Sequence, residues 1–323
     1  MIFAAMTGAG AATTAAVGGI MIPSMEEEGY DPGFASAVQT VGGVFGPIIP
    51  PSILMVLYAV AAGTSVGDML LAGLLPGLFL GLVLIVVVVI QCIRKGYRGS
   101  GRFHLVEVAK SFCHAFWALL APIIILGGIY SGLVTPTEAS ALCCFYCLIV
   151  GVFIYKEIKI KDICKIVYGG VKSAAGIMLI VAATQAFGWV ITRAGIPQKM
   201  AQTFTSSITN PLVFVFAVCV ILLVAGCFID AVPALLIFAP IFCPTADAYG
   251  INMIYFGVVM VIVLCIGLAT PPVGINLYVA SSVGGQPVHK IIPHLPIPLL
   301  AIFVGTVIVI LVPEIITFLP NVL

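Results

Sequence analysis

Apolar residues run along this chain in long blocks that short polar stretches separate. Seven blocks are long enough to cross a lipid bilayer as helices at about 1.5 Å per residue; they cover residues 33–62, 68–93, 111–133, 137–155, 166–192, 253–283 and 294–320. A further apolar block, residues 209–248, is interrupted at its centre by residues 226–230. The pattern predicts an all-α polytopic membrane protein.

Composition supports a membrane environment. Of the 323 residues, 62% are hydrophobic and 8% are charged, and the mean hydropathy is +1.27. The net charge of +1 gives no basis for binding nucleic acid, so lipid is the expected surrounding. The spans contain no Ser-His, paired Asp or HExxH arrangement at a catalytic spacing, and we therefore expect no enzymatic activity.

Basic residues indicate the orientation of the spans. They concentrate in two loops, residues 94–110 and 156–172, which two predicted spans separate. Cytoplasmic loops of membrane proteins carry an excess of Lys and Arg. Both loops are therefore expected in the cytoplasm, which, counting Lys290, places eleven of the thirteen Lys and Arg residues inside.

The interrupted block 209–248 has two interpretations, two full crossings or one re-entrant hairpin. Two crossings would put residues 226–230 in a cytoplasmic loop without Lys or Arg, whereas a hairpin places them near mid-membrane, buried against protein. The hairpin is favoured. Residues 1–24 look like the returning arm of another hairpin, with its tip near Thr7 to Gly10.

The chain matches itself at a fixed offset of 221 residues. The matched pairs are Pro23 and Pro244, Gly29 and Gly250, Asp31 and Asn252, Gly46 and Gly267, Pro50 and Pro271, Pro51 and Pro272, and Gly63 and Gly284. Four predicted spans lie between the two copies, so the copies run through the membrane in opposite directions. Inverted repeats with interrupted helices are typical of secondary transporters, which bind substrate where the repeats meet.

The two Pro-Pro pairs predict a break in each copy, because proline has no N–H to donate within a helix. Unpaired carbonyl oxygens are expected at Gly46, Pro47, Gly267 and Leu268, and such oxygens suit a hard cation such as sodium. A new half-helix that begins with Pro-Pro would direct its free N–H groups at an anion. The alternative, a proline kink in a continuous helix, stays open here.

Four stretches carry a family resemblance: residues 7–77, "TPTEAS" at 135–140, "GCFIDAVPALLIFAPIFCP" at 226–244 and "GLATPPVGINLYVASS" at 267–282. They resemble the large membrane subunit of tripartite ATP-independent periplasmic (TRAP) transporters over essentially all 323 residues. The resemblance implies a sodium-driven importer of the ion-transporter superfamily, in the bacterial inner membrane, in which two hairpins and two broken helices move as an elevator against a scaffold. It also implies a small TRAP membrane subunit, a periplasmic substrate-binding protein, and small carboxylates, including dicarboxylates and sialic acids, as substrates.

The resemblance further implies two sodium sites built mostly from main-chain oxygens. The first site comprises Thr7, Gly8, Gly46, Ile49 and Ser52, and the second comprises Gly226, Gly267, Thr270 and Val273. The candidate substrate contacts are Ser52, Asn276 and Asp230. For Asp230 a role in shaping the hairpin tip is equally open, and for Asn276 a bond to the neighbouring hairpin is the alternative.

The predicted organisation follows the repeats. Residues 1–62 and 166–285 form the transport domain, residues 63–165 the scaffold and connecting helices, and residues 286–323 the last span. Because the first repeat lacks most of its hairpin's entering arm, we expect the chain to be truncated at its N-terminus. Alternative functions are a carboxylate symporter without a binding protein, a cation channel and a pure scaffold subunit.

Overall fold

The computed structural model describes residues 3–97 and 105–322, and these residues form helices and turns without strands. Contacts divide the chain into two compact units, residues 1–99 with 184–323, and residues 100–183. The prediction of an all-α polytopic membrane protein is confirmed. The assignment of residue ranges to a mobile domain and a scaffold stays a prediction.

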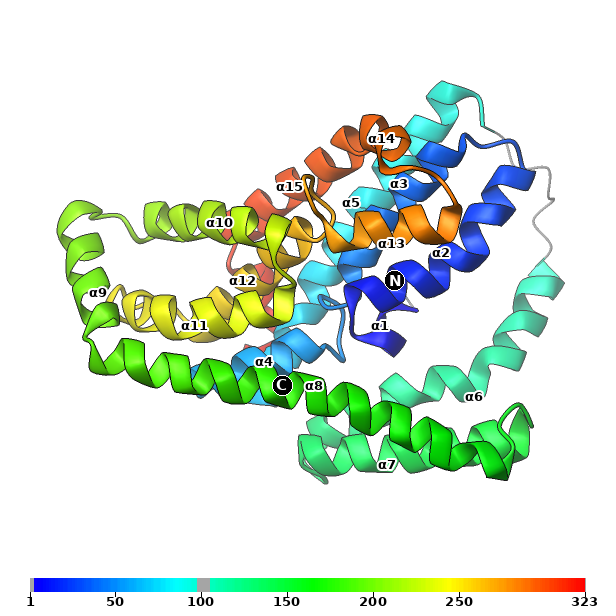
Figure 1. The fold of residues 1–323 in the computed structure, drawn as a ribbon, viewed down its shortest axis with the longest axis horizontal. Helices are drawn as coiled ribbons and strands as arrows, with labels where there is room; N and C mark the ends of the chain where they lie inside the picture. The colour runs from blue at the N-terminus through cyan, green and yellow to red at the C-terminus, as the bar shows by residue number, and fades with distance from the viewer. Residues whose placement is uncertain (1–2, 98–104, 323) are drawn as a thin grey trace. The chain divides into compact units, whose positions relative to one another are not determined.

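The first repeat lies in the larger unit and begins with a short hairpin (Figure 1). Its elements are α1 (Ala4–Thr7), α2 (Gly10–Glu27), α3 (Pro32–Gly42), η1 (Gly43–Phe45), α4 (Ile53–Ala62) and α5 (Val66–Lys95). The predicted hairpin tip is confirmed, because the chain turns between α1 and α2 at Gly8 and Ala9. The predicted break is confirmed between η1 and α4.

The second repeat completes the larger unit, which also holds the part of α8 (Ile163–Arg193) from Thr184 onward. Its elements are α9 (Ile196–Ser207), α10 (Pro211–Phe228), α11 (Ala231–Ala248), α12 (Met253–Gly267), α13 (Ile275–Gly284), α14 (Val288–Ile291), η4 (Ile292–His294), α15 (Pro296–Leu311) and α16 (Glu314–Val322). Helices α10 and α11 run side by side as a hairpin whose two-residue tip lies at the end of α12 (Figure 1). The second predicted break separates α12 from α13.

The smaller unit contains α6 (Leu105–Tyr130), α7 (Pro136–Ile149), the π-helical turn η2 (Val150–Ile154), η3 (Ile160–Asp162) and the start of α8. Tyrosine hydroxyls join its helices. Tyr146 donates to the Trp117 carbonyl at 2.7 Å, and Tyr155 donates to the His114 carbonyl at 2.6 Å. These bonds pack α6 against the α7–η2 segment.

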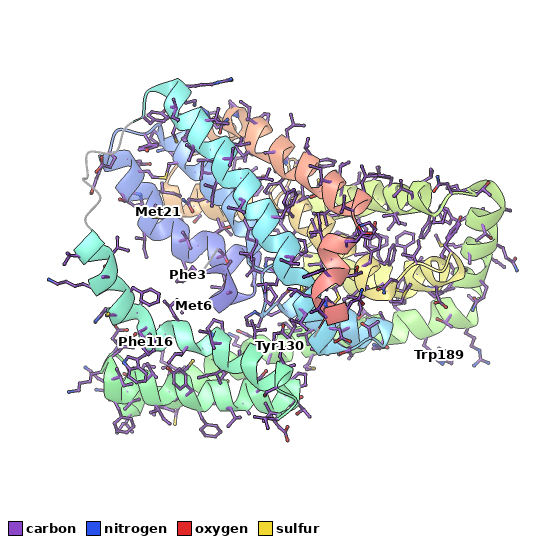
Figure 2. All side chains as sticks on the ribbon, turned by 180° about the vertical axis from the view of Figure 1, so that it is seen from behind. Phe3, Met6, Met21, Phe116, Tyr130 and Trp189 are labelled. Carbon is purple, nitrogen blue, oxygen red and sulfur yellow. The ribbon has the colours of Figure 1, made fainter. Side chains whose placement is uncertain are left out.

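Six helices among the described residues are long and apolar enough to cross a membrane, or seven if the bent pair Val288–His294 and Pro296–Leu311 forms one span. These helices expose apolar side chains, among them Leu82, Val220 and Val224. The first hairpin does the same: Figure 2 shows Phe3, Met6 and Met21 projecting from the larger unit, and Met6 is 43% exposed. Exposed apolar side chains at this density suit lipid as the surrounding solvent.

The helices before the two breaks start at matching positions in the two repeats. Helix α11 begins and ends 221 residues after α2 begins and ends. The following helices have equivalent N-caps: the Asp31 carboxylate accepts from Phe34 N at 2.9 Å, and the Asn252 side chain accepts from Ile254 N and Tyr255 N at 2.8 and 3.1 Å. Asp and Asn are favoured at such N-caps. Their side-chain oxygen accepts a hydrogen bond from a backbone N–H of the first helical turn, which has no partner within the helix.

Packing between the repeats is crosswise. Helix α3, before the first break, contacts α13, after the second break, and α12 contacts α4. Helix α2 likewise lies along α13, whereas α11 contacts α4 (Figure 1). In each case a segment before the break of one repeat packs on the segment after the break of the other. Repeats that run through the membrane in opposite directions pack in this way, which supports the predicted inversion.

Two details of the sequence prediction were wrong. The prolines do not occupy the first helical positions, because α4 begins after Ser52, whose side-chain oxygen accepts from Met55 N at 3.2 Å, and α13 begins after Gly274 at φ +54°. Both Pro-Pro pairs lie in the connecting turns and contain a cis peptide bond. The last predicted span, 294–320, is divided at Val312 and Pro313, because Pro313 has no N–H to continue α15.

Replacing Asn252 with alanine should lower the stability of the protein by about 1 kcal/mol, because two N–H groups of α12 lose their acceptor. The thermal unfolding midpoint in detergent measures the effect. Asn252→Asp keeps the acceptor and serves as the control. Equal midpoints for Asn252→Ala and the wild type would show that the cap does not stabilise α12.

Candidate functional site

The first hairpin tip lies against the first helix break. Gly8 ends α1 with φ +61°, a left-handed conformation that favours glycine. A β-carbon at Gly8 would lie 2.9 Å from the Pro51 carbonyl oxygen, so the tip backbone touches the turn after the break. Thr7 and Gly8 are therefore brought to the break as predicted.

Gly46 is the residue of the break that the first tip covers. A β-carbon there would lie 2.5 Å from the Thr13 hydroxyl and 2.6 Å from the Ala9 carbonyl oxygen. These distances are shorter than a methyl group allows, so only glycine permits this approach. The hydroxyls of Thr7 and Thr13 hydrogen-bond to each other beside it, and Thr13 Oγ1 also donates to the Ala9 carbonyl at 2.9 Å.

The prediction of unpaired oxygens in the first break is partly wrong. The Ser52 hydroxyl donates to the Pro47 carbonyl, because the turn brings the cap residue of α4 back over residue 47. For the Gly46 carbonyl, no hydrogen bond is found within the part of the chain that the structure describes. The N–H of Ile49 bonds to Phe45 instead, at 2.9 Å. The first break therefore retains one free carbonyl at the predicted position.

Ser52 and Ile49 are both buried in this turn. Ser52 is 2% exposed, and its hydroxyl is shared between the Pro47 carbonyl and the N–H of Met55. The Ile49 side chain packs on α5, where a β-carbon at Gly77 would lie 2.9 Å from its Cγ1. Only the main chain of Ile49 is thus in a position to face the tip.

The second tip meets its break by direct backbone contact. A β-carbon at Gly267 would lie 2.6 Å from the Cα of Gly226, and one at Gly226 would lie 2.9 Å from the Leu264 carbonyl oxygen. The N–H of Gly274 donates to the Cys227 carbonyl at 3.2 Å. The predicted pair, Gly226 and Gly267, is therefore in contact, and a hydrogen bond joins the tip to the turn.

Unpaired oxygens were also predicted at Gly267 and Leu268, and this prediction is wrong. Thr270 N donates to the Gly267 carbonyl at 3.0 Å, and Asn276 N donates to the Leu268 carbonyl at 2.9 Å. The turn folds back on itself, so its own N–H groups reach these oxygens. Each carbonyl keeps a second lone pair. The Thr270 hydroxyl donates to the Ile266 carbonyl at 2.8 Å, and the Val273 side chain is 38% exposed.

The N–H groups predicted to face an anion are also partly occupied. In α13, the N–H groups of Leu277 and Tyr278 both bond to the Gly274 carbonyl, at 2.8 and 3.3 Å. In α4, the Ser52 hydroxyl occupies Met55 N. An anion at either helix start would have fewer free donors than the sequence indicates.

Asn276 lies where the two repeats meet. It is 0% exposed, and neither side-chain amide atom has a hydrogen-bond partner among the described residues. A β-carbon at Gly10 would lie 3.1 Å from its Oδ1, and one at Gly43 would lie 3.0 Å from its Nδ2. The amide therefore lies between the first hairpin and the first break, although Asn276 belongs to the second repeat. A buried amide without partners costs about 1–3 kcal/mol, which a bound ligand or water would recover.

Asp230 is exposed at the second tip and makes no side-chain cap for α11. No hydrogen bond or ion pair of the described residues joins it to Ser52 or Asn276. The structure thus brings Asn276 to the first tip and its break and leaves Asp230 apart. The proposal that hydrogen bonds of Asp230 shape the tip has no support in these contacts.

Sequence reasoning missed Thr13, Thr14 and Gly43, which surround the first tip. Thr14 Oγ1 donates to the Gly10 carbonyl at 3.1 Å, and Thr13 provides the hydroxyl nearest to Gly46. The signal was available, because residues three to four positions after a helix start lie one turn above it. The next turn of α2 therefore brings a second side-chain hydroxyl to the tip, beside that of Thr7.

Comparison with known proteins gives consistent matches. The family model for the DctM component of tripartite ATP-independent periplasmic transporters matches residues 1–315. The chain is 41% identical over 321 residues to the C4-dicarboxylate TRAP transporter large permease protein DctM of Pseudomonas aeruginosa, covering 99% of this chain and 75% of that protein. It is 35% identical over 321 residues to the sialic acid TRAP transporter large permease protein SiaM of Vibrio cholerae, covering 99% of this chain and 75% of that protein. It is 36% identical over 313 residues to the isethionate TRAP transporter permease protein DctMQ of Oleidesulfovibrio alaskensis, covering 96% of this chain and 49% of that protein.

Alanine at Gly46 or Gly267 should separate the tip from its break, because a β-carbon does not fit either contact. Overpacking costs about 1–3 kcal/mol, which corresponds to a loss of ligand affinity of roughly fivefold to 150-fold at the affected tip. Uptake by reconstituted protein measures this loss. Gly42→Ala is the matched control, because its β-carbon would meet only Gln39 Oε1 at 3.9 Å. Equal uptake by all three variants would contradict the assignment of a function to the tips.

Proposed function

The chain belongs to the DctM component family of tripartite ATP-independent periplasmic transporters, and on that premise we propose that it couples a sodium gradient to the uptake of small organic acids. It is a multi-pass protein of the bacterial inner membrane and a transporter subunit rather than an enzyme. The family implies a small membrane subunit and a periplasmic binding protein as partners. The resemblance found in the sequence is confirmed.

One observation carries the proposal: each of two hairpin tips lies on a helix break, and the two assemblies pack crosswise. This arrangement buries residues 43–50 of the first break and the Gly226–Gly267 contact of the second, so protein covers that irregular backbone. Secondary transporters with inverted repeats bind ions and substrate at such broken helices. Movement of both hairpins and both broken helices as one body, in elevator fashion, is the proposed mechanism.

The proposed first sodium site uses the oxygens around the first tip. The free Gly46 carbonyl is its central ligand, and the main chain of Gly8 and Ile49 with the hydroxyls of Thr7 and Ser52 completes the predicted set. Thr13 joins this set, because its hydroxyl is the group nearest to Gly46. A cation there would replace the hydrogen bond that the Gly46 carbonyl lacks.

The proposed second sodium site has Gly226, Gly267, Thr270 and Val273 as its predicted residues, and the Gly226–Gly267 contact brings two of them together. The Gly267 carbonyl already accepts from Thr270 N and offers only its second lone pair. Because this oxygen has a protein partner, we expect the site to bind sodium more weakly than the first.

For the substrate, we propose that Asn276 is the principal contact and Ser52 a secondary one. The Asn276 amide has both a donor and an acceptor to offer, and no described residue uses them. A carboxylate accepts hydrogen bonds, so the amide N–H₂ suits it. Asp230 carries the same charge as the substrate, so we propose that it acts in closing the tip and not as a direct contact.

The relatives are named for different acids: C4-dicarboxylates, sialic acid and isethionate. The first two names describe carboxylates, and the third describes a sulfonate. We propose a small carboxylate for this chain, because two relatives of which it covers 75% are named for carboxylates.

Uptake into proteoliposomes tests the proposal, with the permease, its small subunit and its binding protein present and a panel of carboxylates outside. Sodium-dependent, saturable uptake that requires the binding protein is the expected result. Uptake that saturates without the binding protein would indicate the alternative symporter. A current that needs no acid and does not saturate would indicate a cation channel and contradict the proposal.

Asn276→Leu separates a functional amide from a structural one. Because the amide lacks partners, the apolar replacement should leave the unfolding midpoint unchanged or raised, while uptake falls by about tenfold or more. Thermal unfolding and uptake are measured on the same preparation. A lowered midpoint with normal uptake would show that Asn276 only supports the fold.

A further inference from the structure

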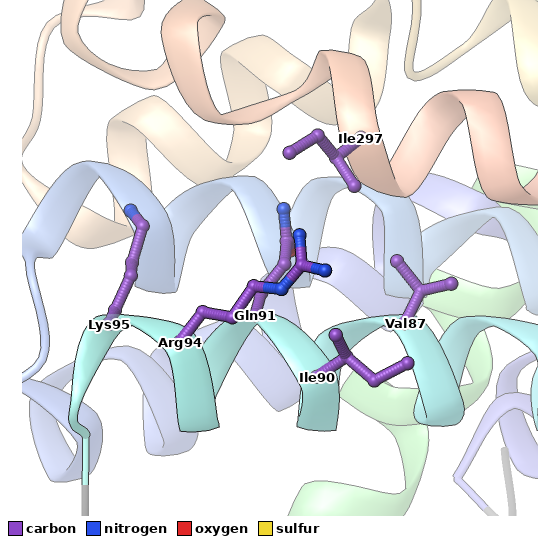
Figure 3. Close-up of a pocket in the computed structure, with 6 residues that line it drawn as sticks. All are labelled: Val87, Ile90, Gln91, Arg94, Lys95 and Ile297. Carbon is purple, nitrogen blue, oxygen red and sulfur yellow. The ribbon is translucent and has the colours of Figure 1, made fainter.

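A pocket of about 310 Å³ lies between α5 and α15, near the end of α5. Figure 3 shows the side chains that line it, which are Val87, Ile90, Gln91, Arg94, Lys95 and Ile297. Its walls are aliphatic, and its mouth carries two cations and no carboxylate. An apolar pocket with a basic mouth suits an amphipathic anion.

The position of the pocket in the membrane follows from the sequence. Helix α5 is a candidate span, and it ends at Lys95, in the basic loop expected at the cytoplasmic surface. Toward the membrane interior, the same helix exposes an apolar stripe that includes Leu82, Val86 and Val89, between 49% and 60% exposed. The pocket therefore joins the headgroup level of the bilayer to a surface along which an acyl chain can lie.

The two cations have different surroundings. The Lys95 ammonium donates to His294 Nδ1 at 3.2 Å and lies 4.7 Å from the centre of the Phe34 ring. The other ring nitrogen of His294 lies 3.0 Å from the Asp31 carboxylate, so that carboxylate is already engaged. The Arg94 guanidinium extends over the pocket beside Gln91 in Figure 3. Lys95 is thus held in place while Arg94 is available to a ligand.

Gln91 adds a requirement for the ligand beyond its negative charge, which the two cations alone would recognise. Its residue is 8% exposed, and its Oε1 is enclosed without a donor among the described residues. A phosphate diester at neutral pH accepts hydrogen bonds and has none to donate, so it cannot satisfy this oxygen. A headgroup that also carries hydroxyl groups can.

The other repeat has no equivalent. At the offset of 221, Gln91, Arg94 and Lys95 correspond to Val312, Ile315 and Ile316. The polar groups of the pocket therefore belong to one side of the membrane only, and the general symmetry of the fold does not account for them.

We propose that this pocket binds an anionic phospholipid whose headgroup carries hydroxyl groups, such as a phosphatidylglycerol. The phosphate lies between Arg94 and Lys95, a headgroup hydroxyl donates to Gln91 Oε1, and an acyl chain follows the exposed stripe of α5. Basic pockets between membrane helices on the cytoplasmic side are suited to such lipids. This inference does not depend on the proposed transport function.

Native mass spectrometry of the delipidated transporter complex tests the site, with phosphatidylglycerol, phosphatidylmethanol and phosphatidylcholine added separately. Phosphatidylmethanol is an anionic diester without a headgroup hydroxyl. Phosphatidylglycerol should be retained most strongly. Arg94→Gln should reduce its retention about fivefold, the amount for one basic residue at a membrane surface. Gln91→Leu should abolish the preference for phosphatidylglycerol over phosphatidylmethanol while both stay ahead of phosphatidylcholine.

The control is the double variant Lys161→Gln, Lys165→Gln, which removes two exposed cations from the other basic loop and should bind lipid as the wild type does. Equal retention of all three lipids, or equal losses in the control and in Arg94→Gln, would overturn the proposal. Displacement of the lipid by inorganic phosphate would also overturn it, because the site would then recognise the phosphate alone.

Discussion

The need of peptide groups for polar partners inside a bilayer is the constraint on which the rest of this structure depends. A helix that stops within the membrane exposes carbonyl and N–H groups that lipid cannot satisfy. Here each of two broken helices is covered by a hairpin tip, and the contact is backbone to backbone. Glycine makes it possible: Gly267 meets the Cα of Gly226, and Gly46 meets the Ala9 carbonyl. The repeats, their crosswise packing and the candidate sites all follow from this contact.

The two tips satisfy the constraint differently. At the second tip, protein donors occupy the Gly267 and Leu268 carbonyls, and Gly274 N joins the turn to Cys227. At the first tip, the Gly46 carbonyl has no such partner among the described residues, and the amide of Asn276 lies next to Gly43. Two groups without partners, the Gly46 carbonyl and the Asn276 amide, therefore lie at the break where the second repeat reaches the first. A ligand bound there would contact both repeats, as coupling between ions and substrate requires.

Much of the backbone could be predicted from the sequence, because Gly and Pro restrict dihedral angles and hydrogen bonds locally. The breaks before Pro50 and Pro271 and the turn at Gly8 are of this kind. The partners of individual oxygens could not be predicted, because they depend on how a turn folds back: Ser52 reaches Pro47, and Asn276 N reaches Leu268. The proximity of Asn276 to Gly10 depends on packing between segments more than 200 residues apart.

Hydrogen exchange of the reconstituted transporter, compared in sodium and in potassium at equal ionic strength, tests most directly whether the covered breaks bind sodium. Sodium should slow exchange at the backbone amides of residues 8–13 and 46–53 and, more weakly, of residues 226–231 and 268–275. Exchange in α6 and α7 should be the same in both salts. Equal exchange of all four segments in sodium and potassium would contradict the presence of cation sites at the hairpin tips.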